Sequence, residues 1–186
     1  MTNQIFTLGI DPGLAHPAFA VLELFTGGNG YRLATSGVFR TAPKDTLDRR
    51  LSEIRFGLAA ALDSYSPRSI LVAGVEAYGV HFTKGGKVKA RNRDGTLQAV
   101  GLIKAVLFER AIPVRTYTEG EGKCSVGVPQ KAAGRTHSER KMPTRVAVMR
   151  ILGLPEILSD HESDAAAQAI CAGNRIGLDR GIRREG

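Results

Sequence analysis

Two short apolar runs of the chain each end in an acidic residue. Residues 5–10 lead into Asp11, and residues 70–75 lead into Glu76. A strand that is covered on both faces reads as a continuous apolar run, so both runs are expected to be inner strands of a sheet. A carboxylate at the mouth of such a strand loses solvation unless a cation or hydrogen-bond donors meet it. The pattern therefore predicts an α/β fold that carries acids at one edge of its sheet.

The length of the chain limits what can surround these acids. With 186 residues, 42% of them apolar, it is long enough for one core of ordinary size and short for two domains. We expect one domain over residues 1–176 and a basic tail over residues 177–186. No apolar run approaches the roughly 18 residues of a membrane span and the first residues lack a signal-peptide layout, so a cytoplasmic protein is expected. Cys124 and Cys171 indicate neither a zinc site nor a disulfide framework.

The charge balance indicates a polyanionic partner. The chain has 26 Lys and Arg against 18 Asp and Glu, a net charge of +8 and an isoelectric point near 9.9. One basic cluster alone would usually be a solvated surface, but three clusters share the same sign. They consist of Lys84, Lys87, Lys89, Arg91 and Arg93; of Lys123, Lys131, Arg135, Arg140 and Lys141; and of Arg175, Arg180, Arg183 and Arg184.

The periodicity of apolar residues predicts a strand-rich first half followed by helices. Strands are expected over residues 4–10, 17–25, 31–39, 69–76 and 112–117, the first three as an antiparallel meander. Helices are expected from Thr46, with Asp45 as its cap, over residues 97–111, from Pro143 to Gly153 and from Asp160. The segment 119–142 is expected to be a long polar loop, either functional or disordered.

The last helix has the clearest local signature. Ser159 and Glu162 form the Ser-x-x-Glu pattern of a capping box, which predicts a helix that begins at about Asp160. His161 and Asp164 then share one face of its first turns and can reach one metal ion. For Asp160 and Glu162 we prefer the role of N-terminal acids favoured by the helix dipole. The other three histidines, His16, His81 and His137, are expected to be loop residues rather than ligands.

Each strand-end acid also has a structural explanation. Asp11 opens an Asp-Pro-Gly turn signal, and an ion pair with Lys or Arg would satisfy Glu76. Combined with His161 and Asp164, however, they form a set of ligands suited to divalent ions. Two such ions about 3.5–4 Å apart can activate a water molecule and stabilise the leaving oxygen of a phosphodiester. The four residues together predict a metal-dependent nuclease.

The order and approximate spacing of these motifs resemble the RuvC family of bacterial and phage Holliday-junction resolvases. The resemblance runs from about residue 5 to residue 172 and is carried by Gly-Ile-Asp-Pro-Gly at 9–13, Val75-Glu76, Leu-Gln-Ala-Val-Gly at 97–101 and His161-x-x-Asp164-Ala-Ala. It implies an RNase H-like fold with a five-stranded mixed sheet flanked by helices, and a homodimer. It further implies symmetric paired cuts across a four-way DNA junction that depend on Mg²⁺ or Mn²⁺, two ions per active site, and branch-migration proteins as partners in a bacterium.

Residue by residue, the resemblance assigns metal binding and catalysis to Asp11, Glu76, His161 and Asp164. Many members have an aspartate at the position of His161, and a neutral imidazole favours Mn²⁺ relative to an all-carboxylate site. The family's catalytic or phosphate-binding lysines correspond to Lys123 and Lys141. Gly79 stands where the family has an aromatic residue that opens the junction, so Tyr78 or Phe82 is expected to substitute for it. The expected DNA contacts are Tyr78, Phe82, Lys84, Lys87, Lys89, Arg91, Arg93, Lys123, Lys131, Arg135 and Arg140.

Three alternatives remain open at this point. Another RNase H-like nuclease would act on flaps, forks or RNA–DNA hybrids, since the catalytic core alone does not choose the substrate. A non-catalytic junction-binding protein could use the same scaffold without nicking DNA. An ATPase of the actin or sugar-kinase type also starts with a Gly-Ile-Asp strand, but it needs two such domains and 186 residues are too few.

Overall fold

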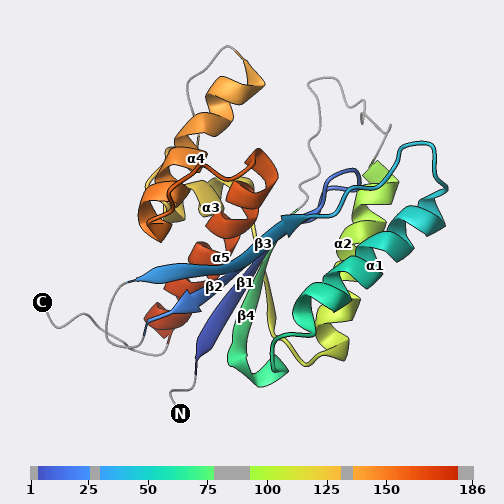
Figure 1. Cartoon of the computed structure of the whole chain (residues 1–186), viewed down its shortest axis with the longest axis horizontal. Coiled ribbons are helices and arrows are strands. Elements are labelled where there is room, and N and C mark those ends of the chain that lie inside the picture. Colours follow the sequence, from blue (N-terminus) through green and yellow to red (C-terminus); the bar gives the residue numbers. More distant parts are fainter. Residues whose placement is uncertain (1–3, 26–29, 78–92, 131–135, 180–186) are drawn as a thin grey trace, which may run out of the picture.

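The centre of the molecule is a five-stranded mixed sheet (Figure 1). The structure is a computed structural model that describes residues 4–25, 30–77, 93–130 and 136–179. The strands are β1 (Ile5–Asp11), β2 (Ala18–Leu24), β3 (Tyr31–Val38), β4 (Ile70–Glu76) and β5 (Val114–Tyr117), in the order β3-β2-β1-β4-β5. The first three are antiparallel, whereas β4 runs parallel to β1 and β5 parallel to β4. This arrangement confirms the predicted RNase H-like architecture.

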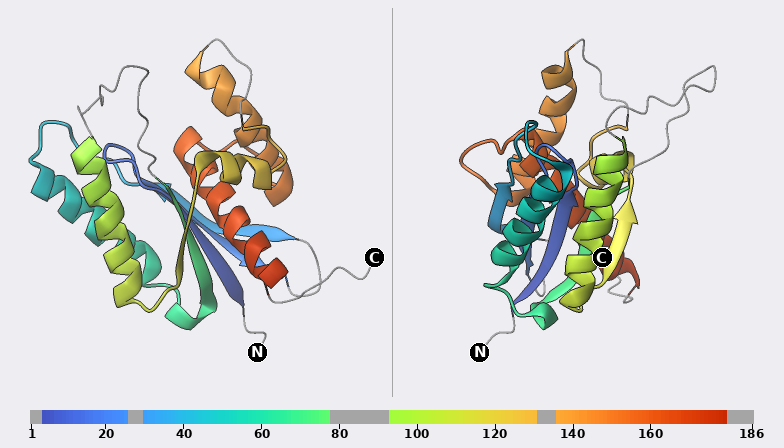
Figure 2. Two further views of the ribbon diagram at one scale, coloured as in Figure 1. Left: turned by 180° about the vertical axis from the view of Figure 1, so that it is seen from behind. Right: turned by 90° about the vertical axis from the view of Figure 1, so that its right-hand side faces the viewer.

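Helices cover both faces of the sheet (Figures 1 and 2). On one face lie α1 (Leu47–Leu62) and α2 (Arg93–Glu109), with a short 3₁₀ turn η1 (Pro67–Ser69) before β4. On the other lie α3 (Glu119–Ser125), α4 (His137–Leu152) and α5 (Asp160–Asp179). Helix α5 therefore continues three residues past residue 176, where the domain was expected to end. Within the described residues, no helix combines the length and apolar character needed to cross a membrane.

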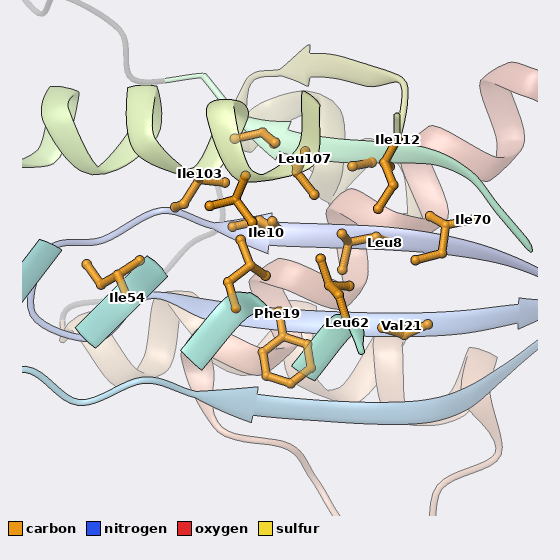
Figure 3. Close-up of a cluster of buried hydrophobic side chains, with 14 of the residues drawn as sticks. Leu8, Ile10, Phe19, Val21, Ile54, Leu62, Ile70, Ile103, Leu107 and Ile112 are labelled. Carbon is orange, nitrogen blue, oxygen red and sulfur yellow. The ribbon is translucent and has the colours of Figure 1, made fainter. Parts of the chain in front are cut away.

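The inner strands explain the two apolar runs of the sequence. Toward α1 and α2, side chains such as Leu8, Ile10 and Ile103 form a fully buried core (Figure 3). Toward α5, the strands lack side chains where the helix crosses: a Cβ added at Gly9 would lie 1.8 Å from the Ala165 carbonyl oxygen, and one at Gly74 would lie 2.5 Å from that of Gln168. Small residues on both sides let α5 lie directly on β1 and β4, which sets the position of its first turn.

Three local expectations were wrong, all because a helix start was misplaced. Thr46 rather than Asp45 caps α1, since the Thr46 side chain accepts the Arg49 amide. The expected loop over 119–142 contains α3 and the first turns of α4, each started by a capping box that begins at Thr118 or Thr136. Pro143 lies inside α4 and not at its first position. The predicted stop of that helix at Gly153 is confirmed, with φ of 61°.

Candidate active site

The strand ends bring the two acids together. Ile10 on β1 is paired with Val75 on β4, so the residues that follow, Asp11 and Glu76, end two adjacent parallel strands. Parallel strands end at the same edge of a sheet, and both carboxylates are partly buried there. The sequence predicted strand-end acids at one edge of the sheet, and the pairing of β1 with β4 places these two side by side.

The first two turns of α5 add the third and fourth side chains, His161 and Asp164. The Ser159 hydroxyl accepts the Glu162 amide at 3.3 Å, and Glu162 accepts the Ser159 amide at 3.3 Å, so the predicted capping box is present. It starts α5 at Asp160 and directs His161 toward β1, where its Nδ1 lies 2.9 Å from Asp11 Oδ2. This hydrogen bond raises the pKa of His161 in spite of partial burial. In the neutral form that carries its proton on Nδ1, His161 keeps the Nε2 lone pair available as a ligand.

Two lysines and a further acid complete the cluster. Lys141 Nζ on α4 donates to Asp164 Oδ2 at 2.7 Å and to Glu119 Oε1 at 3.0 Å. Lys123 Nζ on α3 lies 2.7 Å from the same Glu119 oxygen. Sequence reasoning missed Glu119 because it lies in the segment taken as a loop. The Thr118-x-x-Glu121 capping box was the signal that could have placed it at the start of a helix.

The electrostatics of the cluster are those of crowded acids. Burial raises the pKa of Glu76 to about 8, and the negative charges of Asp11, Asp164 and Glu119 add to the rise. Burial also raises the pKa of Asp164, although the Lys141 ammonium opposes this. Burial would raise the pKa of Glu119 as well, but hydrogen bonds from Lys123 and Lys141 outweigh it and lower the value to about 2. An added cation would relieve the repulsion around Glu76.

The donor set suits a hard divalent cation. The elements β1, β4 and α5 supply three carboxylates and one imidazole. These are ligand types that Mg²⁺ and Mn²⁺ accept. As the side chains lie, no group of three or more His, Cys, Asp or Glu among the described residues is arranged to hold a metal ion. Asp164 is paired with Lys141 in this arrangement, so its carboxylate would have to turn toward an ion.

The structure gathers only some of the predicted DNA contacts. Lys123 joins the cluster as a largely buried residue, whereas Arg140 is exposed in the first turn of α4. Arg93 is the first residue of α2. The predicted contacts that lie outside the described residues are Tyr78, Phe82, Lys84, Lys87, Lys89, Arg91, Lys131 and Arg135.

One histidine is nearer to the cluster than the sequence indicated. His16, in the connection between β1 and β2, is exposed as expected of a loop residue. Its ring nevertheless stacks on His161, with the ring centroids 5.4 Å apart and the planes at 21°. This contact covers one side of an imidazole that is a candidate ligand.

The sequence is similar to one family over nearly all of its length. The profile of the family "Crossover junction endodeoxyribonuclease RuvC" matches residues 7–172. The RuvC protein of Leifsonia xyli subsp. xyli is 31% identical over 175 residues, which cover 94% of this chain and 76% of the relative. That of Clavibacter sepedonicus is 33% identical over 178 residues, covering 93% and 77%.

Solved structures support the fold. The structure of Thermus thermophilus RuvC superposes with a TM-score of 0.73 at 24% identity, covering 93% of this chain and 97% of that one. The same protein in complex with a Holliday junction substrate gives a TM-score of 0.72 at 22% identity, covering 95% and 97%. The two RuvC structures thus share the sheet and helix arrangement described above.

Proposed function

The chain belongs to the RuvC family of crossover junction endodeoxyribonucleases, and from this premise we propose that it resolves four-way DNA junctions by metal-dependent phosphodiester hydrolysis. The observation that carries the proposal is the convergence of Asp11, Glu76, His161 and Asp164 at one edge of the sheet. Two adjacent strands and the first two turns of α5 supply these side chains, so their backbones are held by the core and not by loops.

The proposed cofactors are two Mg²⁺ or Mn²⁺ ions. Asp11 would bind both, Glu76 and His161 would complete one site each, and Asp164 would orient the attacking water or bind the second ion. When bound, such ions activate a water molecule and stabilise the leaving oxygen of the phosphodiester. The Asp11–His161 contact holds two of these side chains beside each other, whereas Asp164 would have to exchange its contact with Lys141 for one with an ion.

The two lysines are proposed to meet the phosphates of the substrate. Burial would lower the pKa of Lys141, but the negative charges of Asp164 and Glu119 and their hydrogen bonds with Lys141 raise it above the usual value. Lys141 therefore stays charged at working pH. A charged ammonium beside the acids can donate to a phosphate oxygen and offset negative charge as the bond breaks. Lys123 contacts the same Glu119 oxygen and can donate in the same way.

The proposed substrate can be tested by comparing branched DNAs. Wild-type protein with Mg²⁺ or Mn²⁺ is expected to introduce paired, symmetric nicks into a four-way junction and to cut 5′-flap, fork and RNA–DNA hybrid substrates at least about ten-fold more slowly. Gel analysis of both labelled strands under single-turnover conditions measures this. Preferred cleavage of flaps or hybrids would favour the alternative nuclease, and no metal-dependent nicking would favour a binding protein.

Paired cuts need two active sites, and we propose that a homodimer supplies them through α2. The outer face of this helix carries an exposed stripe of apolar and small residues, Leu97, Gly101, Ala105 and Phe108, at helical spacing. Leu97 and Phe108 are 44% and 84% exposed, and a Cβ added at Gly101 meets nothing within 4 Å. Such a stripe favours packing against a second copy, because it leaves large side chains in water.

Phe108→Glu is expected to weaken the dimer by about a hundred-fold or more, because it places a charge where an aromatic anchor would be buried. Sedimentation equilibrium measures the dimer, and junction cleavage should change from paired cuts to single nicks. Ile157→Glu is the matched control: Ile157 is 39% exposed but lies in the connection between α4 and α5, the helices that cover the other face of the sheet (Figure 1). A Phe108→Glu protein that remains dimeric would exclude this stripe as the interface.

A further inference from the structure

One oxygen in the active-site cluster receives two ammonium groups. Glu119 Oε1 lies 2.7 Å from Lys123 Nζ and 3.0 Å from Lys141 Nζ. The lysine side chains are 11% and 17% exposed, whereas that of Glu119 is 45% exposed. The carboxylate is therefore the solvent-facing member of the group, with two largely buried cations behind it.

Two converging ammonium groups form a site for an anion with several acceptor oxygens. Lysine binds phosphate as a point charge with three donors, and two such charges can share the oxygens of one phosphate. Lys141 also contacts Asp164, but within the described part of the chain Lys123 has an ion pair with Glu119 alone. Glu119 is thus the carboxylate that both lysines share.

The backbone at Glu119 is fixed, while its side chain can rotate away from the two lysines. Thr118 and Glu121 form a capping box that holds the first turn of α3, and a Cβ added at Gly122 would lie 3.0 Å from Gln168 Nε2 on α5. The helix is therefore packed against the core. The Glu119 side chain, half exposed at the rim, can turn into water by rotation about its own bonds.

We propose that Glu119 occupies a phosphate subsite, so that its carboxylate holds Lys123 and Lys141 until a phosphate group of the DNA displaces it. The inference rests on the proposed function, since it assigns this subsite to a junction-binding nuclease. The exchange replaces one carboxylate oxygen by phosphate oxygens and moves a negative charge out to solvent. DNA that does not place a phosphate at this point gains nothing from the two lysines, so Glu119 acts against loosely bound substrates.

The test is the sign of the change in DNA affinity when the internal anion is removed. Glu119→Gln is expected to bind a four-way junction about ten-fold more tightly in EDTA, where no cleavage occurs, because the lysines lose their competing partner. The slope of log affinity against log salt is expected to stay close to that of the wild type, because both proteins make the same phosphate contacts once Glu119 has been displaced. Fluorescence anisotropy over a salt series measures both quantities.

Two comparisons separate this mechanism from a general loss of negative charge. Glu121→Gln makes the same charge change two residues away, and glutamine can keep the capping box. It is expected to change affinity by less than about two-fold. In the Lys123→Met/Lys141→Met background, Glu119→Gln is expected to have no effect, because the residues through which it acts are gone.

Several results would overturn the inference. Weaker binding by Glu119→Gln would mean that Glu119 positions the lysines for DNA and does not compete with it. An equal gain in affinity from Glu121→Gln, or an undiminished gain in the Lys123→Met/Lys141→Met background, would mean that the change in net charge alone causes the effect. Should thermal melting show that Glu119→Gln is unfolded, Glu119→Ala, which also removes the carboxylate, must show the same gain. Failure of the wild type to bind four-way DNA would instead overturn the proposed function itself, and this inference with it.

Discussion

Junction cleavage by the Asp11→Asn variant is expected to fall by about a thousand-fold or more, while junction binding in EDTA stays within about two-fold of wild type. Asp11 ends β1 beside Glu76, and its side chain, 16% exposed, contacts His161. The amide has the same shape but no negative charge for a divalent ion, so the fold should persist without the reaction. DNA contacts come from basic side chains and should survive.

The measurement is single-turnover cleavage of a labelled four-way junction with Mg²⁺ and, separately, with Mn²⁺. Asp48→Asn is the matched control, since Asp48 is an exposed acid in the first turn of α1, outside the cluster. It is expected to cut at the wild-type rate. Cleavage by Asp11→Asn within about ten-fold of wild type would remove Asp11 from the metal site and return it to the role of a turn residue.

Glu76→Gln is expected to abolish cleavage and at the same time to stabilise the metal-free protein by about 4 kcal/mol at pH 9. Burial and the neighbouring acids raise the pKa of Glu76 to about 8, from an ordinary value of 4.5. Between these two pH values, the Glu76 carboxyl therefore keeps its proton in the folded wild-type protein but has lost it in the unfolded chain. Unfolding releases that proton, so wild-type stability falls as the pH rises through this window, and the neutral amide avoids the loss.

Urea unfolding in EDTA at pH 5, 7 and 9 tests this dependence. At pH 5 the wild-type carboxyl is already protonated in the fold, so the variant should gain little there, and the difference should grow toward pH 9. Adding Mg²⁺ should recover stability in the wild type at pH 9 more than in the variant, because the ion binds the folded carboxylate. An equal gain at pH 5 and pH 9 would show that packing, and not the charge of Glu76, causes the effect.

Much of the fold was predictable because its signals are local. Alternation, apolar runs and turn residues placed all five strands within a few residues, and the Ser159–Glu162 capping box placed the start of α5. The helices that were not predicted carry the same kind of local signal. Two Thr-x-x-Glu boxes, at Thr118 and Thr136, start helices in a segment whose polarity favoured a loop. Pro143 therefore lies inside α4, although a proline also favours a first helical position.

The sequence by itself determined which side chains end the inner strands and open the last helix, since strand period, helix period and caps depend on neighbours along the chain. Only the tertiary structure decided which of these side chains contact one another. His161 meets Asp11 across 150 residues, and Lys141 meets Asp164 and Glu119 across 23 and 22. Such contacts arise from α3, α4 and α5 packing on one face of the sheet, and that packing depends on side chains far apart in sequence. The Thr118–Glu121 capping box places Glu119 in a first helical turn, but only that packing brings it to Lys123 and Lys141.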